Sequence, residues 1–131
     1  MVETHVSVLF FFGDRVYKVR KPVVTPFLDF STRELRLADC QREVQLNRRL
    51  APDVYLGVAP IHRREDGRWQ IGVPREELSL DAATGEPFEH CVVMRRLREG
   101  SDAGSMLRAG GLTPDHVDAV ADMIASFHDR Y

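Results

Sequence analysis

The chain has 131 residues and a formal net charge of −2, and hydrophobic residues make up 44% of it and charged residues 29%. This length corresponds to one domain or to one lobe of a larger one, and the composition excludes a disordered chain. The longest apolar run, Val8–Phe12, is much shorter than the ~20 residues of a membrane-spanning helix, and no basic region followed by an apolar stretch marks a signal peptide.

The charge is unevenly distributed. Residues 1–50 hold nine Lys/Arg and six Asp/Glu, whereas residues 51–131 hold nine and fourteen. This asymmetry favours a local anion site in the first part of the chain, and the lack of an overall basic charge argues against a nucleic-acid partner. The only lysines are Lys18 and Lys21. A lysine in an arginine-rich chain can serve for its compact charge, and codon bias is the other reading.

The two cysteines, Cys40 and Cys91, are far apart and form no C-x-x-C pair. We therefore expect a reducing, cytoplasmic environment in which both thiols act as small buried apolar groups. The five histidines show no spacing typical of metal ligands.

A β-hairpin is predicted near the N-terminus. Residues 7–12 are apolar and aromatic, and residues 15–21 alternate in polarity after the turn at Gly13-Asp14. The alternation places Val16, Lys18 and Arg20 on one face of the strand and Tyr17 and Val19 on the other. Pro ends the second strand, and residues 22–30 are predicted to be a loop with an apolar tip.

A helix is predicted to begin at Ser31-Thr-Arg-Glu34, which has the spacing of a capping box, and to run to about Leu50. Glu43 lies inside the broad apolar arc of this helix, and a buried carboxylate needs a partner. A surface salt bridge to Arg36 or Arg42 is the alternative. The arc comprises Leu35, Leu37, Cys40, Val44, Leu46 and Leu50.

Three more strands are predicted at residues 55–61, 69–73 and 88–94, the first two joined by an Asp-Gly turn and the last buried on both faces. Residues 74–87 are predicted to be a loop, with or without a short helical turn. A short helix over 101–109, closed by two glycines, precedes a final helix that begins at Thr113-Pro114 and carries an apolar stripe to residue 131.

The order of these elements resembles the N-terminal lobe of the protein-kinase-like fold, in which a strand lysine contacts the ATP phosphates and a helix glutamate orients it. Several separate stretches, in order along essentially the whole chain, resemble the bacterial aminoglycoside-phosphotransferase-like family, and in particular its bifunctional aminoglycoside phosphotransferase/ATP-binding members. These stretches are Glu-Thr-His-Val-Ser at 3–7, Tyr-Lys-Val-Arg-Lys-Pro at 17–22, Phe-Leu-Asp-Phe-Ser-Thr at 27–32, residues 46–56, and Val-Met-Arg-Arg-Leu at 93–97.

The resemblance implies an α+β fold. Residues 1–94 would form a kinase-like N-lobe, with an antiparallel sheet of about five strands and one capped helix. Residues 95–131 would form the hinge and the first helices of a truncated C-lobe. The implied ligands are ATP and Mg²⁺, with the metal ligands supplied by the missing part of the C-lobe.

The resemblance also assigns site residues. Lys18 would contact the phosphates, with Glu43 as its helix partner. The hinge, whose backbone meets the adenine, would comprise Met94, Arg95, Arg96 and Leu97. His5 would lie near the phosphates, in the segment where kinases have a Gly-rich loop.

The family's His-Gly-Asp catalytic motif, the Asn after it and the metal-binding Asp are absent from this sequence. The chain is therefore expected to be the ATP-binding portion of a small-molecule kinase and inactive alone. A second hypothesis is a non-catalytic module that pairs with a separately encoded C-lobe, or with itself, through the helix over 117–131. A third, nucleic-acid binding through the arginines, is disfavoured by the interspersed acidic residues.

Overall fold

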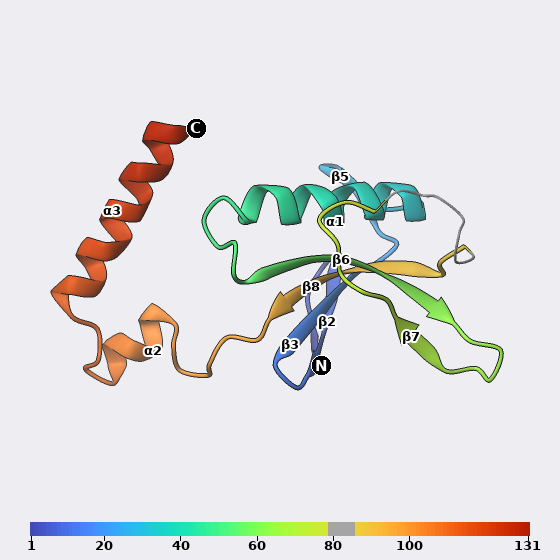
Figure 1. The fold of residues 1–131 in the computed structure, drawn as a ribbon, viewed down its shortest axis with the longest axis horizontal. Coiled ribbons are helices and arrows are strands. Elements are labelled where there is room, and N and C mark those ends of the chain that lie inside the picture. Colours follow the sequence, from blue (N-terminus) through green and yellow to red (C-terminus); the bar gives the residue numbers. More distant parts are fainter. Residues whose placement is uncertain (79–85) are drawn as a thin grey trace. The chain divides into compact units, whose positions relative to one another are not determined.

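A computed structural model describes residues 1–78 and 86–131. The chain is mixed α+β and divides into two compact units, Met1–Arg96 and Leu97–Tyr131 (Figure 1). Among the described residues, no helix is both long and apolar enough to cross a bilayer.

An antiparallel sheet dominates the first unit, with strand order β1-β2-β3-β8-β6-β7. The strands are β1 (Val2–Glu3), β2 (Ser7–Phe12), β3 (Arg15–Arg20), β6 (Tyr55–Arg63), β7 (Trp69–Ile71) and β8 (Glu89–Arg95). The sheet thus has six strands where about five were predicted, because the two residues of β1 add a short edge strand.

Both predicted hairpins of this sheet are confirmed. Gly13 and Gly67 occupy their turns with φ of 58° and 80°, a conformation that glycine adopts without strain. The strand limits differ by a few residues, since β6 continues to Arg63 and β7 ends at Ile71. The aromatic run of β2 is less buried than its composition suggested, and Phe12 is 78% exposed.

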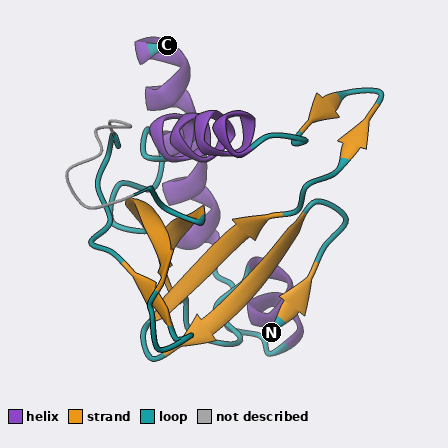
Figure 2. Cartoon of the chain, turned by 90° about the vertical axis from the view of Figure 1, so that its right-hand side faces the viewer, coloured by secondary structure: helices purple, strands orange, loops and turns teal. Residues whose placement is uncertain are grey.

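The predicted loop over residues 22–30 contains a small hairpin of its own, β4 (Val24–Thr25) with β5 (Leu28–Asp29). The Thr25 hydroxyl accepts hydrogen bonds from the amides of Phe27 and Leu28, and this closes a tight turn that composition alone did not reveal. Figure 2 shows this hairpin reaching away from the main sheet. Phe27 lies between its two strands and is exposed.

With Ser31 as the cap, the predicted helix would begin at residue 32 and run to about Leu50. Helix α1 (Arg33–Asn47) begins one residue later and ends about three residues earlier. Its N-cap is Thr32, whose hydroxyl accepts from the Leu35 amide at 3.2 Å. Ser31 instead donates its amide to the carboxylate of Asp29, at 2.9 Å. The last predicted turn is irregular, with the amides of residues 50 and 51 both bonded to the Asn47 carbonyl.

Helix α1 packs on one face of the sheet through a narrower stripe than predicted. Leu37, Cys40 and Val44 are buried against Val58 and Val92, whereas Leu35, Leu46 and Leu50 of the predicted arc are exposed. A helix resting on a sheet buries only the side chains that face it, and the predicted arc was wider than that contact.

The opposite face of the sheet has a second buried cluster, formed by Ala59, Cys91 and Val93. Strand β8 is therefore buried on both faces, as predicted. Both cysteines are free and buried, and burial raises the pKa of each thiol to about 12. Their burial confirms the expectation of small buried apolar groups.

An ion pair fixes the first half of α1 to β8. The Arg36 guanidinium donates to Glu89 at 2.7–2.9 Å and to the Phe30 carbonyl at 2.7 Å. Arg36 is buried, so this charge lies inside the contact between helix and sheet. It is also why Arg36 is not the partner of Glu43.

The second unit contains α2 (Ala103–Arg108) and α3 (Pro114–Arg130). Asp102 caps α2 by accepting from the Ser105 amide at 2.8 Å, and Gly110 follows that helix with φ of 70°. Thr113 is the N-cap of α3 with Pro114 at its first position, as predicted. Neither helix has a buried residue.

The loop predicted over residues 74–87 is described only at its ends, since residues 79–85 lie outside the described part of the chain. On its N-terminal side, Arg75 pairs with Val58 through two backbone hydrogen bonds.

We predict that His90 makes the fold sensitive to acid. Burial lowers the pKa of its imidazole, and its Nδ1 has no hydrogen-bond partner among the residues that the structure describes. The folded chain therefore holds His90 neutral, while the unfolded chain binds a proton below about pH 6.5. The free energy of unfolding in urea should fall from pH 7 to pH 5.5, by at most about 1.4 kcal/mol per pH unit from this group. The His90→Leu variant should lose less stability over the same interval, and equal slopes would contradict the prediction.

Candidate functional site

Lys18 and Glu43, which the sequence pattern singled out, are in direct contact. The Lys18 ammonium on β3 lies 2.9 Å and 3.1 Å from the two carboxylate oxygens of Glu43 on α1. The side chains are 25% and 11% exposed, so the pair lies at the edge of the core and the ammonium is its more accessible member. The structure thus pairs Glu43 with a cation of the sheet, and not with Arg42 of its own helix.

Arg20 is a second cation at Glu43, and sequence reasoning did not identify it as a site residue. Its Nη2 contacts Glu43 Oε2, its Nε donates to Asp39 Oδ2 at 2.7 Å, and its Nη1 donates to the hydroxyl of the buried Ser7 at 2.8 Å. Its side chain is 7% exposed. Burial alone would lower the pKa of this guanidinium, but Glu43 and Asp39 outweigh that effect and raise the pKa.

Local geometry explains why these four charges meet. Side chains two apart on a strand point to the same face, which places Lys18 and Arg20 side by side on β3. Side chains four apart on a helix share a face, which places Asp39 and Glu43 together on α1. The strand contributes two positive charges and the helix two negative ones. The signal for Arg20 was therefore present in these two spacings.

Beside this cluster, apolar side chains occupy the same face of the sheet. Lys18 is opposite Leu9 on β2, and Val16 is opposite both Phe11 on β2 and Met94 on β8. Residues directly opposite in an antiparallel pair lie on one face, so Leu9, Phe11, Val16 and Met94 form an apolar strip next to the ammonium. Val16 is buried and the other three are partly exposed.

The four residues expected to form a hinge lie at the end of β8 and directly after it. Met94 and Arg95 belong to β8, and the Arg95 amide donates to the Val54 carbonyl at 2.8 Å. The Arg96 amide donates to the Asp14 carbonyl at 2.7 Å, and its guanidinium lies 5.4 Å from the Phe11 ring centre. Leu97 is the first residue of the second unit.

His5 lies in the turn between β1 and β2 and is exposed. This turn is closed by Thr4, whose amide donates to the Ser7 carbonyl at 2.8 Å, and by Lys21, whose ammonium donates to the Thr4 carbonyl at 2.7 Å. In the described part of the chain, no hydrogen bond or ion pair joins His5 to Lys18 or Glu43.

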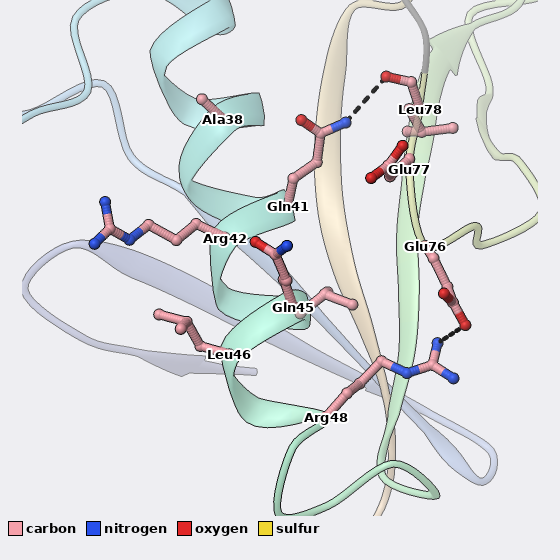
Figure 3. A pocket seen from close by; sticks show the side chains of 10 residues that line it. Ala38, Gln41, Arg42, Gln45, Leu46, Arg48, Glu76, Glu77 and Leu78 are labelled. Atoms are coloured by element: carbon pink, nitrogen blue, oxygen red, sulfur yellow. Dashed lines mark hydrogen bonds and ion pairs between the residues drawn. The ribbon is translucent and has the colours of Figure 1, made fainter. Parts of the chain in front are cut away.

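A separate hollow lies between α1 and residues 76–78 (Figure 3). Gln41 reaches across it to the Leu78 carbonyl at 3.0 Å, and Arg48 forms an ion pair with Glu76 at 2.8 Å. Neither Lys18 nor Glu43 lines it. It is therefore distinct from the charge cluster.

Within the ranges that the structure describes, no group of three His, Cys, Asp or Glu residues could hold a metal ion. The residues described here thus offer no dedicated Mg²⁺ site.

Comparisons with known proteins find relatives of undefined function. Over 128 residues the chain is 40% identical to uncharacterized proteins of Mycobacterium bovis and of two strains of Mycobacterium tuberculosis. The match covers 98% of this chain but 22% of each relative, so the chain spans less than a quarter of their length. No family model and no solved structure matches the chain.

We predict that Lys18 contributes little to stability and that Arg36 contributes much. Lys18→Met leaves Glu43 paired with Arg20, so the free energy of unfolding should fall by no more than about 1 kcal/mol. Arg36→Met removes the cation from the Glu89 carboxylate, which is 13% exposed, and should cost about 3–5 kcal/mol. Urea denaturation of the two variants measures both values. Equal losses would show that Glu43 depends on Lys18 as fully as Glu89 depends on Arg36.

Proposed function

We propose that the first unit binds the phosphates of ATP·Mg²⁺ through Lys18 and is the ATP-binding portion of an aminoglycoside-phosphotransferase-like small-molecule kinase. The observation that carries the proposal is the contact between Lys18 on β3 and Glu43 on α1. A strand lysine held by a helix glutamate is the arrangement with which protein kinases contact nucleotide phosphates. A cytoplasmic location, where the two free thiols stay reduced, goes with this proposal.

The charges of the cluster are suited to a polyanion. Lys18 is the most exposed member of the ion pairs at Glu43, and a compact ammonium can approach phosphate oxygens from several directions. Because Glu43 also contacts Arg20, Lys18 does not neutralise this carboxylate alone. Its charge is therefore available to a ligand.

The apolar strip gives the other end of a nucleotide a surface to lie on. Val16, Leu9 and Met94 continue from the ammonium across the sheet, and Phe11 leads to the guanidinium of Arg96. A flat aromatic base buries apolar area on such a surface, while the phosphates stay at the charged end.

The hinge interactions implied by the family resemblance are constrained by the backbone. The amides of Arg95 and Arg96 already donate to carbonyls within the first unit. An adenine at this end of the strip would therefore rely on other backbone groups of the hinge, and contacts with these two amides are not part of the proposal.

The chain lacks the catalytic-loop motif of the family, so binding without turnover is proposed for these residues. We predict that the purified chain binds ATP·Mg²⁺ in a calorimetric titration and that Lys18→Ala weakens binding by at least about 10-fold, the loss of one charge-assisted contact. Arg68→Ala is the matched control, because it removes a cation from the β6–β7 turn, where the side chain is 84% exposed. Equal affinity of the Lys18 variant and the wild type, or no binding by the folded wild type, would refute the proposal.

A second candidate function is favoured by α3. Val117, Val120 and Ile124 lie on one face of this helix, and about half of each side chain is exposed. An apolar stripe of this kind is typical of a contact surface. The corresponding function is a non-catalytic module that associates with a separately encoded C-lobe or with a second copy of the chain.

We predict that, if α3 is such a surface, the chain self-associates with increasing concentration in sedimentation equilibrium. Ile124→Glu should abolish the association, because it places a charge in the middle of the stripe. Asp122→Lys, on the opposite face of the helix, should leave it unchanged. A chain that stays monomeric at all concentrations would argue against self-pairing through α3.

A further inference from the structure

Arg20 is buried beside the proposed phosphate ligand, yet it is not placed to bind a phosphate itself. Each of its three guanidinium nitrogens already donates to a protein oxygen, on Asp39, Ser7 and Glu43. The Phe30 ring lies 5.6 Å from the guanidinium carbon. Arg20 is thus held by side chains of β2, of α1 and of the segment that precedes α1. Any effect of Arg20 on a bound phosphate must therefore act through a neighbouring side chain.

That neighbour is Glu43, whose carboxylate is shared. Oxygen Oε2 contacts Arg20, and both oxygens contact the Lys18 ammonium. Breaking a buried ion pair by removing one partner is costly, because the remaining charge is left uncompensated. In a cluster without Arg20, movement of Lys18 toward a phosphate would leave the Glu43 carboxylate without a compensating cation.

With Arg20 present, the same movement costs less. The guanidinium stays against Glu43 through its fixed bonds to Asp39 and Ser7, so the carboxylate keeps a cation when the ammonium moves away. We propose that Arg20 is a positioning residue of the nucleotide site, which keeps Glu43 paired and so frees Lys18 for the phosphates of the ligand. This inference rests on the proposed function.

A double-mutant cycle tests it. Arg20→Gln should weaken ATP·Mg²⁺ binding by at least about 10-fold, because Glu43 then holds Lys18 back. In the Glu43→Gln background Lys18 has no Glu43 carboxylate to hold it back, so the same change should alter affinity by less than about 3-fold. Arg48→Gln is the matched control, since it removes a cation at the end of α1 whose ion pair is with Glu76. It should bind as the wild type does.

The conservative variant adds a rescue. Arg20→Lys keeps a positive charge beside Glu43 but cannot satisfy Asp39, Ser7 and Glu43 as the planar guanidinium does, so it should restore part of the affinity that Arg20→Gln loses, provided that circular dichroism shows each variant folded. A purely structural role for Arg20 predicts something else, namely equal losses in both backgrounds. That result would overturn the inference and leave the proposed function standing.

A measurement on the unmodified sequence covers the case in which Arg20→Gln fails to fold. The chain contains two lysines, so lysine-selective ¹³C labelling gives two Cε resonances, with Lys21 as internal reference. In a second sample labelled with ¹⁵N-arginine, the Nε resonance of Arg20 is followed. On addition of ATP·Mg²⁺ the Lys18 resonance should shift, while the ¹⁵Nε resonance of Arg20 stays in place. Loss or displacement of the Arg20 resonance together with that of Lys18 would overturn the inference. A wild type that binds no nucleotide would overturn both the inference and the proposed function.

Discussion

The carboxylate of Glu43 contacts two cations of one strand, and the arrangement of the first unit depends on this contact. A single negative charge on α1 joins the helix to Lys18 and Arg20 of β3, while the apolar side chains beneath the helix supply the nondirectional part of the packing. Ion pairs of this kind add little net stability, but these contacts join one turn of α1 to positions 18 and 20 of β3. They hold the ammonium of Lys18 at the carboxylate of Glu43.

Much of this could be predicted from local patterns. The alternation along β3 and the position of Glu43 on the helical wheel indicated a strand lysine and an inward carboxylate, and the structure brings the two together. Arg20 was missed because an arginine on a strand is usually solvated, and its burial depends on Ser7 and Asp39, which lie on other elements. The two spacings that place it there became informative only once β3 and α1 were known to face each other.

Other features could not be predicted because they depend on contacts between distant segments. The buried stripe of α1 consists of the side chains that pack against the sheet, so Leu35 and Leu46 are apolar yet exposed. The β4–β5 hairpin depends on one threonine hydroxyl, and strand β1 on pairing with the first residues of β2. The fold alone does not establish kinase-like function, because one fold can serve different functions and the relatives are themselves uncharacterized.

The use of lysine at one position and arginine two residues later matches the two tasks proposed for them. A guanidinium with three occupied nitrogens is suited to a fixed position, since its planar fork satisfies several acceptors at once. An ammonium on a flexible stem is suited to movement between a carboxylate and a phosphate. In a chain where sixteen of the eighteen cationic residues are arginine, one of the two lysines stands at the position where a mobile charge is useful. Exchange of the two residue types between positions 18 and 20 would keep every charge and lose this division of tasks.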